Sequence, residues 1–324
     1  MALHVQSAAA DLSAASVSSA PPLGVFGGSG LYDLEGMVDR KESTLETPFG
    51  APSGPLVTGT IAGARVAFLA RHGRHHRFSP SEINYRANVH AMKQLGVQRL
   101  LSISAVGSLR EGIVPGDLVL VDQFIDKTHA RANTFFGQGI VGHVSFAEPV
   151  CAGFSTFLAQ VAEDTGYRPA VAADRDRAVS PQSPRSPELH RGGTYVCMEG
   201  PQFSTRAESR LHRGWGADVI GMTAAPEAKL AREAELCFSS LALSTDYDAW
   251  RDGEEAVSAE SVVAVLLANV ARAQQVVSAA APRAANASWT CDCGRAAERA
   301  VLTASEAVSS ETRQRLQLLY GRYL

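Results

Sequence analysis

A carboxylate, an aromatic ring, a methionine and a hydroxyl lie in predicted turns of the segment 192–227, as Glu199, Phe203, Met222 and Thr223. Side chains in turns and at element ends can reach a ligand, whereas those inside elements mostly pack in the core. Capping of the following helix would explain the serine in the turn EGPQFS. It would not explain Phe203, which could lie against a planar ring. A purely structural turn is the alternative.

Two further carboxylates, Asp246 and Asp248, follow the end of an apolar stretch that begins at Leu236. Burial of acidic groups costs free energy unless a partner compensates for it. Alternate residues of an extended chain share a face, so both could address one edge of one ligand. A ring with an exocyclic amino group would suit them, because ionised carboxylates only accept hydrogen bonds. A helix cap or a salt-bridged loop is the alternative.

Four loops place hydroxyl groups or cations at predicted strand ends, where an anion could bind. Arginine binds phosphate in a bidentate manner, and free backbone N–H groups add donors. Each loop alone could be a tight turn or a solvated basic turn, and the first matches neither common phosphate-loop motif. Together they indicate an oxyanion site. The loops contain Gly27-Gly28-Ser29-Gly30, Arg71-His72, Ser104-Ala105 and Met222-Thr223.

Strands alternate with helices along the chain, which predicts an α/β domain with helices on both faces of a largely parallel or mixed sheet. Functional loops then cluster at the strand ends. We expect the first helix to begin at a capping box, Ser79 to Glu82, and the last to begin at Ser258. The predicted strands are 23–26, 66–70, 100–104 and 118–125, and the predicted helices are 79–95, 154–166, 205–214, 226–235 and a long one after 258.

The chain divides into three predicted parts. Residues 1–22 are expected to be a disordered leader without the basic region of a secretory signal. Residues 23–282 form the domain, and 283–324 form a C-terminal extension with a short helix. Within the domain, 168–191 is rich in Pro, Ser and Arg, which predicts an exposed, mobile insertion.

Composition narrows the classes of partner. The 324 residues are 45% hydrophobic and 19% charged with a net charge of −3, which is typical of a soluble globular protein. This charge favours neither nucleic acid nor an anionic membrane as a partner. No apolar run approaches the roughly 18–20 residues of a membrane span. We therefore expect a cytoplasmic protein.

Five cysteines are spread over the chain. Cys151, Cys197 and Cys237 stand singly among apolar or small residues and are predicted to be buried hydrophobes. Cys291 and Cys293 form a Cys-x-Cys pair, which is too sparse for a zinc site that usually needs four ligands. We expect this pair to be a reducible disulfide or to stay reduced, without a catalytic role. No metal site is predicted.

Seven segments between about residue 23 and 282, without 168–191, match those of one known family. They are GVFGGSGLYDLEG, TPFGAPS, FLARHGRHHRFSPSEINYRAN, SAVGSLREGIVPGDLVLVDQFIDKT, HVSFAEPVC, TYVCMEGPQFSTRAESRLHRGWGADVIGMTAAPEAKLAREAE and STDYDAW. In these segments the chain resembles the methylthioadenosine phosphorylases, trimeric members of the purine nucleoside phosphorylase family. The resemblance implies an α/β single-domain purine nucleoside phosphorylase-like fold with a central mixed sheet flanked by helices. It also implies a homotrimer, with pairing of trimers left open.

The resemblance also implies roles for individual residues. Asp246 would be the general acid and act with Asp248 on the purine edge, beside Tyr247. His143 would help to form the pocket around the sugar's 5′ substituent, across a subunit boundary. The implied phosphate ligands are Ser29, Arg71, His72, Ser104, the Ala105 backbone and Thr223; Met222 would contact the ribose and Phe203 the base, and Ser204, Ala259 and Val262 would tune substrate choice.

The implied reaction is phosphorolysis of S-methyl-5′-thioadenosine to adenine and 5-methylthioribose 1-phosphate, with phosphate as co-substrate and no metal or organic cofactor. A 6-oxopurine or methylthioinosine phosphorylase is the rival within the family, although aspartates repel a 6-carbonyl. A nucleoside-binding module without catalysis is another alternative. A serine hydrolase that uses Ser29 or Ser204 is disfavoured, because neither lies in a GxSxG elbow.

Overall fold

The computed structural model describes residues 21–171, 175–177, 186–251 and 259–324, with the backbone alone for 259–264. The leader predicted at 1–22 therefore lies almost wholly outside the described residues. So do the predicted helix start at Ser258 and the side chains of Ala259 and Val262.

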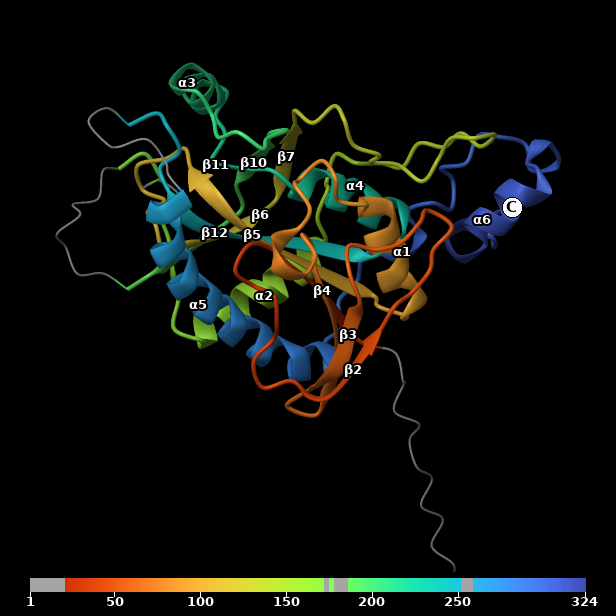
Figure 1. The fold of residues 1–324 in the computed structure, drawn as a ribbon, viewed down its shortest axis with the longest axis horizontal. Coiled ribbons are helices and arrows are strands. Elements are labelled where there is room, and N and C mark those ends of the chain that lie inside the picture. The colour runs from red at the N-terminus through yellow and green to blue at the C-terminus, as the bar shows by residue number, and fades with distance from the viewer. Residues whose placement is uncertain (1–20, 172–174, 178–185, 252–258) are drawn as a thin grey trace, which may run out of the picture.

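A mixed sheet forms the centre of the fold (Figure 1). Its strands are β1 (Leu23–Gly27), β2 (Val38–Ser43), β3 (Leu56–Ile61), β4 (Ala64–Ala70), β5 (Arg99–Ser108), β6 (Leu118–Val121), β7 (Gln123–Asp126), β8 (Arg168–Pro169), β9 (Glu188–Arg191), β10 (Thr194–Cys197), β11 (Val219–Gly221) and β12 (Cys237–Asp246). In the described residues these twelve strands follow the order β2-β3-β4-β1-β5-β12-β6-β9-β8, and β10 joins β7 and β11 beside that path. Strands β4, β1, β5 and β12 are parallel, so their carboxyl ends meet at one edge.

Helices cover both faces of the sheet (Figure 1). They are α1 (Tyr85–Gln94), α2 (Ala152–Asp164), α3 (Arg206–Gly214), α4 (Ala224–Glu233), α5 (Ala259–Asn286) and α6 (Ser310–Tyr320). Alternation along β5 sends Leu101 and Ile103 to the core beneath α2 and α5, and Leu100 to the core beneath α1 and α4. The predicted α/β fold with a mixed sheet between helices is confirmed.

Three predicted element boundaries are wrong. The strand predicted at 100–104 continues to Ser108 as β5, so Ser104 and Ala105 lie within a strand and not in a loop after it. The first helix begins at Tyr85, because the Asn84 side chain accepts a hydrogen bond from Ala87 N and caps it. Ser79 N and Oγ do donate hydrogen bonds to Glu82 Oε2, but these bonds close a turn that precedes the helix. The predicted strand 118–125 is two strands, β6 and β7, with different partners. They separate at Asp122, whose carboxylate accepts a hydrogen bond from the Gly193 backbone at 2.9 Å.

The segment 168–191 is not wholly an irregular insertion. Its two ends form β8 and β9, which pair with each other, and β9 also pairs with β6. A buried contact of 2.9 Å between His190 Nε2 and Asp117 Oδ2 holds β9 in place. In the middle of the segment, Arg175 Nη1 lies 3.3 Å from Asp218 Oδ2. The strands escaped prediction because they are short and rich in charged residues.

The C-terminal extension packs against the domain. The Trp289 ring stacks on Phe154 of α2 with centroids 5.7 Å apart, and the Arg99 guanidinium lies 4.7 Å from the Trp289 ring centroid. Further on, Val301 forms a β-bridge with Gly142. The short helix predicted in this extension is α6, which lies at the right-hand side of the molecule in Figure 1.

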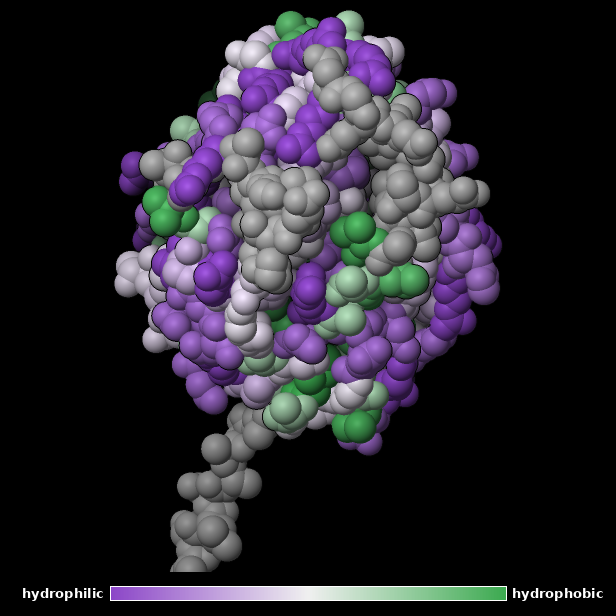
Figure 2. Space-filling model, turned by 90° about the vertical axis from the view of Figure 1, so that its left-hand side faces the viewer, coloured by the Kyte–Doolittle hydropathy of each residue, from purple (hydrophilic) through white to green (hydrophobic). Residues whose placement is uncertain are grey.

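One face of the molecule can be seen to be mostly polar. Figure 2 shows the left-hand side of Figure 1, where hydrophobic residues form small separate patches among hydrophilic ones. Among the described residues, no helix combines the length and the apolar character that a membrane crossing requires.

Candidate active site

A cavity of about 540 Å³ opens at the edge where the parallel strands end. Segments far apart in the sequence meet there, because it is lined by the last parts of β5 and β12 and by residues that follow β1, β4, β11 and β12. Of the residues singled out by sequence, it is lined by Ser29, Arg71, His72, Ser104, Ala105, Phe203, Met222, Thr223, Asp246 and Asp248.

Arg71 is the buried cation of this cavity and is 1% exposed. Its Nε donates to Glu227 Oε1, and its Nη2 donates to Glu227 Oε2 at 3.0 Å. The same Nη2 reaches Ser102 Oγ at 2.8 Å, and Nη1 reaches the Ile103 carbonyl at 3.0 Å. A buried ion pair needs such complete hydrogen bonding to offset its desolvation. The guanidinium is thus fixed, with one Nη1 hydrogen free of these partners.

Glu227 escaped the sequence analysis. It stands in the first turn of α4, where a glutamate is an ordinary helix residue, and no spacing links it to Arg71. A buried glutamate is uncommon without a partner, and Glu227 is 1% exposed. Only the fold, which packs α4 against the end of β4, brings the two side chains together.

Two hydroxyl groups in the cavity wall are available to an anion. Ser104 Oγ is buried and meets no hydrogen-bond partner of good geometry among the described residues, although the Tyr195 hydroxyl is near. Thr223 is the N-cap of α4, but its side chain makes no capping bond. The free N–H groups at the start of a helix attract anions. The positions of Arg71, Ser104 and Thr223 in one cavity wall can therefore receive an anion.

His72 is neutral in this environment. Burial and the neighbouring Arg71 charge lower the pKa of His72 to about 3. Its Nδ1 lies 2.8 Å from the Phe78 carbonyl, to which it donates, and its ring stacks on His76 with centroids 4.2 Å apart. A bound anion would raise the pKa of His72, because a nearby negative charge favours the imidazolium form.

Two glycines permit close approach at the site. A Cβ on Gly28 would lie 2.7 Å from the Ile103 carbonyl oxygen and 2.9 Å from Arg71 Nη1. A Cβ on Gly107 would lie 2.9 Å from Asp246 Oδ1. Such contacts are too short for any side chain, so glycine is required at both positions.

Asp246 lies at an irregularity of the sheet. The pairing between β12 and β5 shifts after Ser244, so that Asp246 pairs with Gly107, and such bulges redirect side chains next to active sites. Burial raises the pKa of the Asp246 carboxyl, against hydrogen bonds from Thr245 and from the backbone N–H of Asp248 that lower it.

The contacts of Thr245 are consistent with a proton on Asp246. The Thr245 hydroxyl oxygen lies 3.1 Å from the Val106 carbonyl and 2.7 Å from Asp246 Oδ2. A hydroxyl has a single hydrogen. When that hydrogen goes to Val106, the short contact with Asp246 is satisfied by a proton on the carboxyl. The arrangement can therefore hold a carboxylic acid at this strand end.

Asp248 complements Asp246. Its backbone has φ 50°, a left-handed conformation that Asp and Asn tolerate better than most residues. Its Oδ2 is buried without a hydrogen-bond partner among the described residues. An unsatisfied carboxylate oxygen at a cavity wall is a ready acceptor for a donor on a ligand.

The apolar part of the cavity includes Phe203 and Met222. Phe203 is 50% exposed, which is unusual for a phenylalanine ring and leaves its face open to a ligand. A second residue that the sequence analysis missed, Arg131, holds the two loops in place. It is fully buried and donates to the carbonyls of Met222 and Glu199.

Glu199, by contrast, supports the loop from outside the cavity. It accepts hydrogen bonds from Ser81 Oγ and from His129 N at 2.7 Å. Burial alone would raise the pKa of Glu199, but these bonds and the Arg131 charge lower it to about 2. Glu199 is therefore ionised and structural.

Some predicted residues lie elsewhere. Tyr247 does not line the cavity: its ring packs edge-on against Trp250, and the Arg251 guanidinium lies 4.0 Å from its ring centroid. Ser204 does not line the cavity, and its hydroxyl lies 3.8 Å from Met198 Sδ. His143 is exposed and lies outside the cavity of its own chain.

Comparisons with known proteins show the family of this chain. The phosphorylase superfamily model matches residues 22–282. An S-methyl-5′-thioadenosine phosphorylase of Geobacter sulfurreducens is 50% identical over 93% of this chain and 99% of its own length. An S-methyl-5′-thioadenosine phosphorylase of Koribacter versatilis is also 50% identical, over 93% of this chain and 96% of its own length.

Two solved structures also superpose on this chain over most of its length. A methylthioadenosine phosphorylase from an antarctic soil metagenomic library superposes with a TM-score of 0.83 at 43% identity, over 93% of this chain and 99% of that one. The methylthioadenosine phosphorylase of Schistosoma mansoni in complex with adenine superposes with a TM-score of 0.76 at 34% identity, over 93% and 98%.

Proposed function

Because this chain belongs to the phosphorylase superfamily and closely resembles its S-methyl-5′-thioadenosine phosphorylases, we propose that it acts as one. It is a pentosyltransferase that converts S-methyl-5′-thioadenosine and phosphate to adenine and 5-methylthioribose 1-phosphate. One observation carries the proposal: a single cavity brings the Arg71 guanidinium and its neighbouring hydroxyl groups together with the half-buried carboxyl of Asp246, whose pKa is raised.

Phosphate is proposed to bind where the fixed donors converge. Arg71, Ser104 and Thr223 would contact its oxygens, together with Ser29, His72 and the Ala105 backbone, all of which line the same cavity. The glycosidic bond breaks through a cationic sugar, which a bound dianion stabilises before it attacks. Because the donors are held in advance, little reorganisation is needed when charge develops.

The leaving purine gains a proton at N7. Asp246 can supply it, because burial keeps a larger share of this carboxyl protonated. Asp248 can accept a hydrogen bond from the 6-amino group through its unpartnered Oδ2. Phe203 would lie against the base and Met222 against the ribose. No step in this scheme calls on a metal or an organic cofactor.

We further propose a homotrimer located in the cytoplasm. His143 is exposed, and it could complete the 5′ pocket of a neighbouring subunit. Ser204, Ala259 and Val262 are proposed to influence substrate choice, although only Ser204 has a described side chain. The oligomer can be measured directly by light scattering of the purified protein. A monomer that is fully active would refute the shared pocket.

An activity panel tests the proposed reaction. It compares methylthioadenosine, adenosine, inosine and methylthioinosine, each with and without phosphate, and follows release of the free base. We expect phosphate-dependent release of adenine, fastest from methylthioadenosine. Faster release of hypoxanthine would assign the 6-oxopurine reaction instead. Tight binding of nucleoside without base release would make the chain a binding module.

A further inference from the structure

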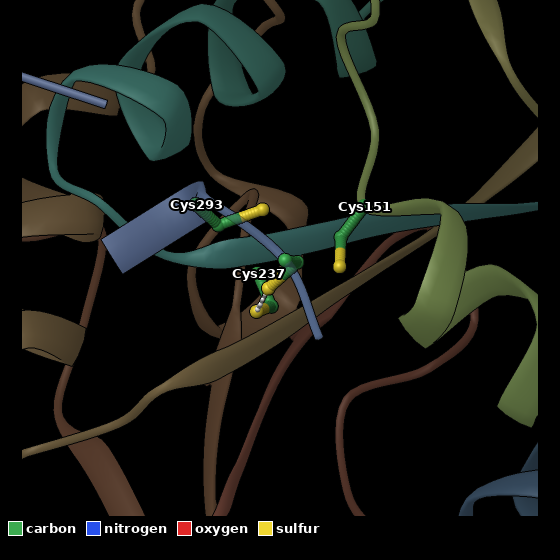
Figure 3. Close-up of side chains that lie close together, drawn as sticks. Cys151, Cys237 and Cys293 are labelled. Atoms are coloured by element: carbon green, nitrogen blue, oxygen red, sulfur yellow. Dashed lines mark hydrogen bonds between the residues drawn. The ribbon is translucent and has the colours of Figure 1, made fainter. Parts of the chain in front are cut away.

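Four cysteines converge at a place the proposed reaction does not use. The Sγ atoms of Cys151, Cys237, Cys291 and Cys293 all lie within 4.8 Å of one another. In Figure 3 the labelled thiols turn toward a common space between the start of β12 and the start of α2. The fold thus adds Cys151 and Cys237 to the Cys-x-Cys pair, so that four thiols meet where the local sequence shows only two.

The cluster is built from three separate segments. Cys151 is the N-cap of α2, and its N–H donates to the Phe238 carbonyl at 2.8 Å. Cys237 begins β12, and its N–H donates to the Gln98 carbonyl at 2.9 Å. These backbone bonds fix two of the four thiols on regular elements. Cys291 and Cys293 arrive from the C-terminal extension.

We propose that the four thiolates bind one Zn²⁺ ion as a structural site. Tetrahedral zinc with Zn–S bonds of about 2.3 Å places its sulfur atoms about 3.8 Å apart. The sulfur–sulfur distances in the structure include that spacing. The Sγ atoms of Cys237 and Cys291 are 3.5 Å apart, and all four Sγ atoms lie within 4.8 Å of one another. Four thiolates leave no open coordination position, so the site is structural and not catalytic.

The surroundings suit an anionic tetrathiolate. Arg232 Nη1 lies 4.0 Å from Cys293 Sγ and can donate to that sulfur. Cys151 stands at the N-terminus of α2, where the helix dipole favours a thiolate. Cys151 and Cys293 are buried, whereas Cys291 is exposed, so the ion has a way in from solvent.

Such a site would attach the C-terminal extension to the domain. Trp289, two residues before Cys291, packs on Phe154 of α2, so the chain is already held close to Cys151. The cluster lies at the start of β12, and Asp246 lies at its end. The zinc site is thus separate from the cavity, and the inference does not depend on the proposed reaction.

Disulfide formation is the competing chemistry. Two bridges would need only two separate pairs, for example Cys237 with Cys291. The mutual approach of all four sulfur atoms fits a single ion better, because each is within reach of the same centre. Disulfides are also disfavoured in a reducing compartment such as the proposed cytoplasm.

Metal content and spectroscopy on the full chain test the site. The protein is expressed with zinc, purified under nitrogen, and analysed by elemental mass spectrometry. We expect one zinc per chain and none after unfolding with a chelator. Refolding with Co²⁺ should give the intense visible bands of tetrahedral thiolate coordination. Failure of the reduced protein to take up either metal would refute the proposal.

Variants locate the ligands. Cys291→Ser/Cys293→Ser should lose nearly all bound zinc and lower Tm, whereas Cys197→Ala, a buried cysteine outside the cluster, should keep one zinc per chain. Zinc retained by the double variant would overturn the assignment. Should the double variant fail to fold, the wild-type protein decides: zinc must protect the exposed Cys291 from a thiol reagent. An intact mass showing disulfides in protein purified under nitrogen would equally overturn it.

Discussion

The Glu227 carboxylate accepts hydrogen bonds from both Nε and Nη2 of the Arg71 guanidinium. Ser102 Oγ donates a further hydrogen bond to Glu227 Oε2 at 2.6 Å. The pair links the end of β4 to the first turn of α4, whose N-cap, Thr223, lines the same cavity. The position of the cation is therefore set by a residue that does not itself line the cavity.

Replacing Glu227 by Gln should destabilise the protein and weaken phosphate binding. The change leaves the buried Arg71 charge without its counter-ion, which costs about 3–5 kcal/mol of unfolding free energy. The KM for phosphate should rise because the guanidinium loses one of its fixed partners. Chemical denaturation and phosphate saturation curves measure the two effects.

The matched control is Glu298→Gln, which removes an exposed pair with Arg295. Surface pairs contribute at most about 1 kcal/mol, so this variant should be close to wild type in both assays. Equal stability losses in the two variants would show that burial of the Arg71 pair has no special weight.

Asp246→Asn should lower kcat by about 10²-fold or more, because an amide cannot supply the proton. Burial raises the pKa of Asp246, so the wild-type rate should fall as pH rises through that pKa, where the acid form disappears. The variant should lack this alkaline limb. A pH–rate profile of kcat for both proteins is the measurement, and an unchanged profile would remove Asp246 as the acid.

Asp248→Asn should change base preference more than folding. Asparagine tolerates the same left-handed backbone, and its amide can donate to a 6-carbonyl where the carboxylate only accepts. The ratio of kcat/KM for methylthioinosine over methylthioadenosine should rise by about tenfold or more. A ratio equal to that of wild type would mean that Asp248 does not contact the 6-position.

His72 should make stability depend on pH. Its folded pKa of about 3 lies below the ordinary value of 6.5, so unfolding takes up a proton as pH falls between these values. The stability that the neutral ring provides is complete above about pH 6.5 and is lost progressively toward pH 3. His72→Gln should reduce the slope of unfolding free energy by about 1.4 kcal/mol per pH unit in that range. Denaturant titrations of both proteins between pH 4 and 6 measure this slope. An identical slope in the two proteins would show that His72 does not cause the pH dependence.

Strand ends were the predictable part of this protein. Arg71, Ser104 and Asp246 follow or end strands with clear apolar patterns, so the α/β rule alone brings them to one edge. Tyr247, between Asp246 and Asp248, does not line the cavity, in keeping with the rule that neighbours on an extended chain face opposite sides.

Long-range partners were not predictable. Glu227 and Arg131 look like ordinary helix and loop residues until the fold places them beside Arg71 and Met222. The thiol cluster has the same origin, since Cys151 and Cys237 are far from Cys291 in the sequence. Local patterns carry no information about contacts that arise only from tertiary packing.

The close approach of Gly28 to Arg71 constrains how this site can drift in evolution. A variant with any other residue at position 28 must first move the Ile103 carbonyl or the guanidinium, so change there requires a compensating change elsewhere. The next residue, Ser29, only has to present a hydroxyl, and threonine would do so on the same backbone. Two adjacent positions of one loop are thus expected to diverge at very different rates, one locked by its backbone and one open to exchange.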